Sequence, residues 1–491
     1  MTLVFSGNRY KYEIEGIMKL FIPAVRFKHI FTEPGESCET GNDRVIVGVR
    51  EEEAGVLLFV AADYLGKTEH REQRLSKDDP SDRELLLSRL LYQAMSTITD
   101  VTPKWGVMTG VRPVKRVNRY IDEGLSREEI KELFAREYYC SAEKFDIAYR
   151  TAQVQRSIMP TVTEDSFSLY VSIPFCPTRC SYCSFISQTL DSGRKLIPDY
   201  IDLLCREIEY TANISKRLGL RLDTVYFGGG TPTSIEASQL ARIMNTVERS
   251  FDMGSVREYT VEAGRADTIT REKLQTVRDC GATRISVNPQ TLSDSVLEAI
   301  GRRHTAAQFL YAFSLARELG FRHINTDIIA GLPTDTPESF AATLDGLTAL
   351  APENITVHTL SIKRAADLNY AAEKQSVLKN PTGVMVDRAA RVLTDNGYSP
   401  YYLYRQKNML ENLENIGWSK PGEESLYNIF IMEEIQTILA VGAGASSKLV
   451  DRRGARLDRI FNYKLPLEYI RHFDHMLDMK KEIVDFYAEK E

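Results

Sequence analysis

The sequence has no long apolar run and no excess of positive charge. No stretch of about eighteen consecutive apolar residues occurs, so no membrane-spanning helix is expected. The start, MTLVFSGNRYKYEIEG, lacks the basic-then-apolar layout of a signal peptide. The formal net charge of −6 leaves no broad basic surface for nucleic acid. We therefore expect a cytoplasmic protein that binds neither a membrane nor nucleic acid.

Cysteine is scarce as well, with seven residues in 491. An odd, small number in a chain kept in a reducing compartment predicts no disulfide framework. Four of the cysteines are scattered and are expected to be ordinary core or surface residues. They are Cys38, Cys140, Cys205 and Cys280. The other three lie close together near the middle of the chain.

The first 160 residues are expected to form an N-terminal extension with two parts. Apolar alternation in residues 1–75 predicts a strand-rich, α/β or mostly β module. Residues 82–159 have helical spacing, and Ser126 followed by Glu129 matches a capping box. A basic run in this part could face an anionic ligand, although a solvated helix face is the more frequent reason for one. It consists of Arg112, Lys115, Arg116 and Arg119.

Residues 161–375 alternate strand-like and helical patterns with regularity. Each β-then-α step joins parallel strands through a right-handed crossover, which predicts a partial (β/α)6 barrel within an α/β chain. In such barrels the chemistry lies at the carboxyl ends of the strands. The strand-like segments are 169–174, 224–229, 259–264, 284–289, 324–331 and 355–362. Residues 376–491 are expected to form a C-terminal α/β cap domain.

Three cysteines directly follow the first of these strands. Cys176, Cys180 and Cys183 form a C-x3-C-x2-C run, with Tyr182 just before the third. Thiolates this close cannot easily pair as disulfides, but they can bind one face of an iron–sulfur cluster and leave one iron open. A zinc site is the alternative, although zinc prefers four protein ligands and no fourth one lies nearby in the sequence. Incidental clustering is the remaining interpretation.

Other polar and glycine-rich motifs also follow strands. Gly228, Gly229 and Gly230 precede Thr231, and three glycines allow a ligand to approach the backbone closely. Acceptors for an ammonium group and ribose hydroxyls occur at later strand ends. An arginine guanidinium could also bind a carboxylate through two parallel hydrogen bonds. These residues are Glu262, Gln290, Asp327 and Arg302.

These motifs together resemble the radical S-adenosylmethionine (SAM) enzymes, and among them the oxygen-independent coproporphyrinogen III dehydrogenases. The resemblance covers about residues 169–464, and the region with GVRPVKR resembles the HemZ branch. It implies that Cys176, Cys180 and Cys183 hold a [4Fe–4S] cluster. It also implies a first SAM site at Tyr170, Gly229 and Glu262, with Tyr170 and Arg302 as the candidate catalytic residues. The positions matching a second SAM site are Tyr182, Gly230, Thr231, Gln290, Arg302 and Asp327.

The implied reaction converts two propionates of coproporphyrinogen III to vinyl groups, giving protoporphyrinogen IX in haem biosynthesis. A 5′-deoxyadenosyl radical would abstract a hydrogen, after which CO2 and an electron are lost. A reducing donor such as flavodoxin or ferredoxin is the implied partner, and an anaerobic setting fits an oxygen-sensitive cluster.

One position departs from the dehydrogenase pattern. The best-known dehydrogenases have a further cysteine two residues after the third ligand, and this chain has Phe185 there. A similar residue occurs in the haem-chaperone branch, and another relative opens the haem ring. The alternatives are therefore a haem chaperone or a radical SAM enzyme for another tetrapyrrole.

Two motifs remain in the C-terminal region. The segment 397–418, rich in tyrosine and asparagine, could supply aromatic walls for a tetrapyrrole, with Arg405 or Lys407 reaching propionates, or it could be a surface strand. The small residues 442–447 could close over the cofactor end of the barrel or serve packing only.

Overall fold

The computed structural model describes residues 1–23, 25–34, 36, 41–110, 112–185, 187–362, 381–406, 409–451 and 456–488. The chain divides into two compact units, one of residues 1–152 and 404–414, the other of residues 153–403 and 415–491. Residues 376–491, for which a domain of their own was expected, are shared between these units. Within the described part, no helix is long and apolar enough to cross a membrane.

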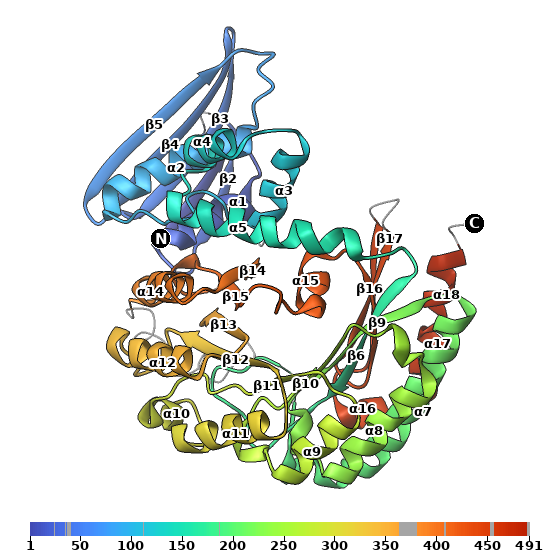
Figure 1. Ribbon diagram of the computed structural model, residues 1–491. Helices are drawn as coiled ribbons and strands as arrows, with labels where there is room; N and C mark the ends of the chain where they lie inside the picture. Colours follow the sequence, from blue (N-terminus) through green and yellow to red (C-terminus); the bar gives the residue numbers. More distant parts are fainter. Residues whose placement is uncertain are drawn as a thin grey trace. The chain divides into compact units, whose positions relative to one another are not determined.

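The first unit contains a mixed sheet with strand order β2-β1-β3-β4-β5 (Figure 1). β1 (Thr2–Ser6) runs parallel to β2 (Lys28–Thr32) and β3 (Arg44–Glu52), whereas β4 (Gly55–Tyr64) and β5 (Lys67–Leu75) continue it antiparallel. The strand-rich module is therefore α/β. Apolar alternation over residues 1–75 also led us to expect strand in Lys11–Phe21, and this is wrong, because the segment is the helix α1, which buries Ile14, Ile17 and Met18 at helical spacing.

Four helices predicted as a helical region complete this unit. They are α2 (Arg83–Thr99), α3 (Pro113–Asp122), α4 (Arg127–Tyr138) and α5 (Ala142–Ile158), the last of which continues into the second unit. The capping box is confirmed, since the Ser126 hydroxyl accepts from Glu129 N–H and the Glu129 carboxylate accepts from Ser126 N–H. In the basic run, Arg116 hydrogen bonds to the Tyr138 hydroxyl and Arg119 pairs with Glu123 at 3.3 Å.

The second unit is built on a mostly parallel sheet. Consecutive parallel strands lie side by side in chain order: β6 (Ser166–Ile173), β9 (Arg221–Gly229), β10 (Glu258–Glu262), β11 (Arg284–Ser286), β12 (His323–Ala330) and β13 (Asn354–Thr359). Helices in the connections cover one face (Figure 1). They are α7 (Ile197–Arg217), α8 (Ala237–Ser250), α9 (Arg271–Asp279), α11 (Ala306–Glu318) and α12 (Pro337–Leu350).

C-terminal strands extend both edges of this sheet. β16 (Thr437–Val441) pairs parallel with β6, followed by β17 (Ser446–Asp451) and β18 (Arg456–Phe461). On the other edge, β15 (Asn415–Ser419) pairs antiparallel with β13, followed by β14 (Ser399–Tyr404). Among the described residues, the edge strands of this sheet are β14 and β18, which do not pair with each other, so the sheet is open.

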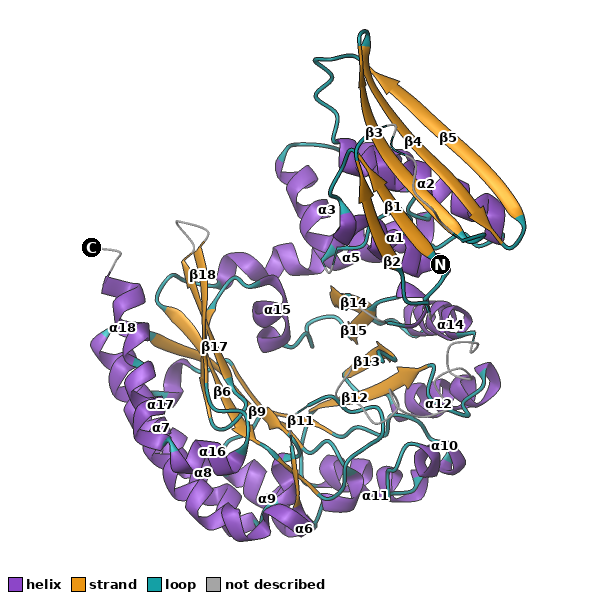
Figure 2. Ribbon diagram, turned by 180° about the vertical axis from the view of Figure 1, so that it is seen from behind, coloured by secondary structure: helices purple, strands orange, loops and turns teal. Residues whose placement is uncertain are grey.

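The two faces of the sheet differ in polarity because strand residues alternate. Apolar side chains such as Val225, Phe227 and Val261 are fully buried under the covering helices. The opposite face has Tyr170, Tyr226 and Glu262, and α15 (Leu426–Glu433) lies on this side, as Figures 1 and 2 both show. Polar residues therefore lie on the face that the covering helices do not cover.

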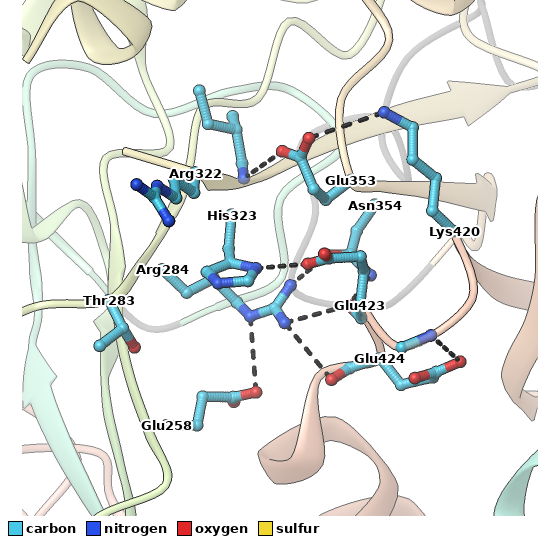
Figure 3. A network of polar contacts seen from close by, with 12 residues as sticks. Glu258, Thr283, Arg284, Arg322, His323, Glu353, Asn354, Lys420, Glu423 and Glu424 are labelled. Carbon is cyan, nitrogen blue, oxygen red and sulfur yellow. Dashed lines mark hydrogen bonds and ion pairs between the residues drawn. The ribbon is translucent and has the colours of Figure 1, made fainter. Parts of the chain in front are cut away.

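Charged residues at the amino ends of the strands form a separate network (Figure 3). Arg284, the first residue of β11, lies 3.4 Å from the Glu258 carboxylate and donates to the carbonyls of Glu423 (3.0 Å) and Glu424 (3.3 Å). Glu258 also accepts from the N–H of Leu426, at the start of α15 (2.8 Å). Since chemistry in this fold lies at the opposite strand ends, this network is structural.

Candidate functional site

The cysteine run lies on the loop that follows β6. Cys176 ends the short strand β7 (Phe175–Cys176), and the loop returns through β8 (Gln188–Thr189). Cys180 is buried, with 7% of its surface exposed, and its carbonyl accepts from Cys183 N–H at 3.1 Å. Burial raises the pKa of the Cys183 thiol to about 11. Within the described residues, no three His, Cys, Asp or Glu side chains are placed to hold a single metal ion.

The glycine loop packs directly against the cysteine loop. Gly229 has φ +108°, which L side chains rarely adopt. A Cβ on Gly230 would lie 2.6 Å from the Phe175 carbonyl oxygen and 3.0 Å from Cys176 Sγ. Thr231 donates its N–H to the Phe175 carbonyl (2.8 Å), and its hydroxyl lies 3.5 Å from Cys176 Sγ. Glycine is therefore required at position 230, because the two loops approach too closely for a Cβ beside the Cys176 sulfur.

Arg302 connects Cys180 with the end of β11. Its guanidinium lies near Tyr182 and Cys180, which interact with its charge, and it donates to the carbonyls of Asn288 (2.6 Å) and Gly264 (3.3 Å). The side chain is 8% exposed. Arg302 therefore brings a positive charge to the cysteine loop, although it lies 119 residues after Cys183 in the sequence.

Glu262, the last residue of β10, faces an aromatic stack. The Tyr226 hydroxyl donates a hydrogen bond to it, and Tyr226 stacks on Tyr427 of α15 with ring centroids 4.4 Å apart. Tyr170 stacks on Tyr226 at 6.1 Å. Burial raises the pKa of Glu262 to about 7, and the Asp327 carboxylate adds to the rise. The hydrogen bond from Tyr226 and the charge of His358 act in the opposite direction.

Gln290 and Asp327 meet through the backbone. Gln290 has φ +67°, and its N–H donates to the Asp327 carbonyl at 2.9 Å. The side-chain oxygen of Gln290 is buried and has no hydrogen-bond partner among the described residues. Burial raises the pKa of Asp327, but hydrogen bonding and charge from His358, with hydrogen bonds from Asn325 and Thr356, outweigh this and hold it below its usual value. Asp327 is therefore ionised at neutral pH, and the Gln290 oxygen is a buried acceptor whose hydrogen-bonding capacity is unused among the described residues.

The predicted site residues therefore gather on neighbouring strands of one sheet, and we call the carboxyl ends of β6, β9, β10, β11 and β12 the strand-end rim. Asp327 differs from expectation in lying inside β12, three residues before its end. Residues that the sequence did not single out complete the site. They are Tyr226, Arg265, Asn288, Asn325, His358 and Tyr427. Asn325 and Asn288 each lie two residues before a predicted site residue, and this spacing could have identified them. Tyr427 comes from the distant helix α15, and no such signal marks it.

The tyrosine-rich segment does not form an open wall. Tyr401 and Tyr402 on β14 are 0% and 5% exposed, so they belong to the core. Arg405 is 2% exposed and belongs to the first unit, where it hydrogen bonds to the Met108 carbonyl and donates to that of Asn412 at 2.8 Å. The expected role of Arg405 toward propionates is therefore wrong, and Lys407 lies outside the described residues.

The small-residue turn after β16 lies beside the end of β6. The Ser172 hydroxyl donates to the Ala443 carbonyl at 2.8 Å, and a Cβ on Gly442 would lie 2.6 Å from the Ser172 carbonyl oxygen. The turn therefore packs against the strand that leads into the cysteine loop. The scattered cysteines Cys140, Cys205 and Cys280 are free, and Cys38 lies outside the described residues.

Comparisons with known proteins show what this chain is similar to. Residues 170–347 match the radical SAM superfamily. The chain is 38% identical over 408 residues to the oxygen-independent coproporphyrinogen-III oxidase-like protein HemZ of Bacillus subtilis, covering 82% of this chain and 81% of that protein. It therefore belongs to the radical SAM family of HemZ-like, coproporphyrinogen-III oxidase-like proteins.

Two further relatives bear on the fold and the branch. The heme chaperone HemW of Lactococcus lactis is 30% identical over 60% of this chain and 73% of its own length. The structure of coproporphyrinogen III oxidase (HemN) from Escherichia coli aligns with a TM-score of 0.51 and 23% identity, over 66% of this chain and 73% of that one. The HemN likeness supports the mixed α/β fold with its large, mostly parallel sheet.

Membership of this superfamily implies a [4Fe–4S] cluster and SAM, and the residues present fit both. Three thiols on one loop are the donors that such a cluster uses. Gly230 leaves space beside Cys176 that a Cβ would fill. The unpartnered Gln290 oxygen and the Glu262 and Asp327 carboxyl groups are acceptors suited to an ammonium and hydroxyls.

Proposed function

We propose that this protein catalyses oxygen-independent oxidative decarboxylation of coproporphyrinogen III to protoporphyrinogen IX. The observation that carries the proposal is that the cysteine loop lies on the same strand-end rim as the acceptors from β10 and the β11–β12 region. The relationship to HemZ supports the choice of substrate, because it extends beyond the radical SAM region to 82% of the chain. We expect a tetrapyrrole substrate and a reducing donor such as flavodoxin or ferredoxin as partners.

Cys176, Cys180 and Cys183 would hold the cluster. With the cluster and SAM bound, the site would gain one-electron radical chemistry. Gly229 and Glu262, with Tyr170, would hold SAM, and the ionised Glu262 carboxylate would accept from its ammonium group. A second SAM could use Tyr182, Gly230, Thr231, Gln290, Arg302 and Asp327, and the orphaned Gln290 oxygen supports a ligand there.

Several side chains would exclude water from the reacting groups. Tyr170, Tyr226 and Tyr427 stack on the polar face of the sheet, which places apolar ring surface next to Glu262. His358 lies 3.6 Å from Asp327 and keeps that carboxylate ionised. The radical would therefore form in a place with fixed hydrogen-bonding groups and little free solvent.

The test is an anaerobic assay of the reconstituted, reduced protein with SAM and coproporphyrinogen III. Mass spectrometry follows 5′-deoxyadenosine and the tetrapyrrole. Loss of two CO2 per substrate is the expected result. Production of 5′-deoxyadenosine without decarboxylation, while a second tetrapyrrole such as haem is changed, would overturn the substrate assignment and retain the radical enzyme.

A haem chaperone is the second candidate function. Phe185, two residues after Cys183, is 70% exposed, so an aromatic ring stands open to solvent beside the cysteine loop. A flat haem could stack on such a ring. Tight haem binding with neither 5′-deoxyadenosine nor decarboxylation would favour this candidate, and Phe185→Ala should then weaken haem binding.

A further inference from the structure

Cys180 lies beside a second buried arginine, Arg265, that matches none of the cluster or SAM positions described above. Arg265 follows β10, and its side chain is 3% exposed. Its Nη1 lies 3.9 Å from Cys180 Sγ and donates to the Thr178 hydroxyl (2.8 Å) and carbonyl (3.1 Å). Thr178 lies between Cys176 and Cys180 in the loop, so Arg265 touches both the loop backbone and a ligand sulfur.

The guanidinium of Arg265 is fixed in its orientation by Asp267. Nε and Nη2 donate to the two carboxylate oxygens at 3.0 and 2.7 Å, which is a bidentate fork. The remaining nitrogen, Nη1, is the one directed at Thr178 and Cys180. The pair therefore presents its positive end to the sulfur and its negative end away from it.

A hydrogen-bond donor with positive charge beside a cluster sulfur stabilises the more negative, reduced state of the cluster. Charge, hydrogen bonds to the sulfurs and burial are the properties by which a protein sets the reduction potential of an iron–sulfur cluster. Because both Arg265 and Cys180 are buried, solvent screens their interaction only weakly.

We propose that Arg265 is a positioning residue that raises the reduction potential of the cluster, with Asp267 moderating its effect. The electron comes from a low-potential one-electron donor of the flavodoxin or ferredoxin class, and no bond is formed or broken in this step. The inference rests on the proposed cluster assignment but not on the tetrapyrrole substrate. Arg302 also contacts Cys180, but it is an expected SAM contact, so Arg265 is the residue whose effect on the cluster can be separated from SAM binding.

The test is a redox titration of the reconstituted full-length protein without SAM, followed by the EPR signal of the reduced cluster. Arg265→Gln should make reduction about tenfold less favourable, which is a downward shift of about 59 mV for a one-electron couple. Asp267→Asn should shift the potential upward, because it removes the negative charge that offsets Arg265. Arg265→Lys should recover part of the loss. Arg303→Gln is the matched control. Arg303 is exposed, and its substitution removes the same charge from a neighbouring loop.

Opposite shifts in the Arg265 and Asp267 variants, with no shift in the Arg303 variant, would support the proposal. An unchanged potential in Arg265→Gln, or shifts of the same sign in both variants, would overturn it. If Arg265→Gln does not take up four irons, the Asp267→Asn potential decides, and an unchanged value there overturns the proposal. A wild-type protein without a cluster would instead overturn the ligand assignment itself, and this inference with it.

Discussion

Tyr226 on β9 donates a hydrogen bond from its hydroxyl to the carboxyl group of Glu262 on the neighbouring strand β10. Tyr226 is in turn covered by Tyr427. This aromatic burial raises the pKa of Glu262 to about 7, so the carboxyl group is only partly ionised at neutral pH before a ligand arrives. An ammonium group at this position would favour the ionised form and lower the pKa again.

The first prediction is that SAM binds more tightly as pH rises through about 7. Only the ionised Glu262 accepts from the ammonium in full, so the affinity should increase on the alkaline side of its pKa and then level off. Glu262→Gln should bind SAM about tenfold or more weakly and lose this pH dependence, for a charge-assisted hydrogen bond of about 1.5–3 kcal/mol. Calorimetric titration of the anaerobic protein at a series of pH values measures both. The same pH profile in Glu262→Gln would remove Glu262 as its source.

The second prediction concerns the hydrogen bond itself. Tyr226→Phe keeps the aromatic ring but removes the donor that lowers the pKa of Glu262. The midpoint of the SAM affinity profile should therefore move to higher pH, while the plateau at high pH stays near that of the wild type. Tyr401→Phe is a control, since this buried tyrosine on β14 accepts its hydrogen bond from Asn428 and not from a carboxyl group of the site. An unshifted midpoint in Tyr226→Phe would show that the hydrogen bond does not control ionisation.

The parallel strands could be predicted from the sequence because their pattern is local. β6, β9 and β12 combine apolar residues with turn residues at their ends, and the crossover rule then fixes their order. Cys176, Glu262 and Gln290 follow from the same rule, since the carboxyl ends of successive strands meet. Helix α1 was misjudged because apolar residues in Lys11–Phe21 fit either period over so short a stretch.

The residues that could not be predicted depend on contacts between distant parts of the chain. Arg405 lies in the core of the first unit, where its guanidinium carbon is 5.2 Å from the ring centroid of Trp105. Trp105 precedes it by 300 positions in the sequence. Tyr427 joins the site through α15, whose first residues donate backbone N–H groups to Glu258 at the amino end of β10. No local pattern distinguishes such an arginine or tyrosine from one on an open surface.

A third prediction tests the close approach of the glycine and cysteine loops. Gly230→Ala would place a Cβ 2.6 Å from the Phe175 carbonyl oxygen and 3.0 Å from Cys176 Sγ, so the cysteine loop must shift. We expect this variant to lose most of its cluster, measured as iron content and brown absorption after reconstitution. Gly264→Ala is the matched control, because its Cβ would meet only Asn288 Nδ2 at 3.5 Å. Equal iron content in both variants would contradict the steric argument.

The fourth prediction separates the structural network at the amino ends from the strand-end rim. Arg284→Met leaves the Glu258 carboxylate, 5% exposed, without its charged partner, and should cost about 3–5 kcal/mol of unfolding free energy. The cluster should still form, because the network lies at the opposite strand ends. Urea denaturation compared with Lys420→Met tests this, since Lys420 is 35% exposed and its pairing with Glu353 should be worth at most about 1 kcal/mol. Equal losses in the two variants would show that burial of the Arg284 network adds nothing.

The fifth prediction concerns Asp327, whose carboxylate is held ionised by His358 and Asn325. Asp327→Asn keeps the shape but removes the negative charge, so it should spare the iron content and reduce turnover by about tenfold or more, if a ligand donor there forms a charge-assisted hydrogen bond. The loss should be equal at pH 6 and pH 8, because the lowered pKa keeps Asp327 ionised over that range. His358→Gln is the companion variant, since it removes the imidazole that lies 3.6 Å from Asp327 but leaves the carboxylate in place. It should therefore lose less activity than Asp327→Asn. Unchanged turnover in Asp327→Asn, with full cluster content, would place this carboxylate outside the site.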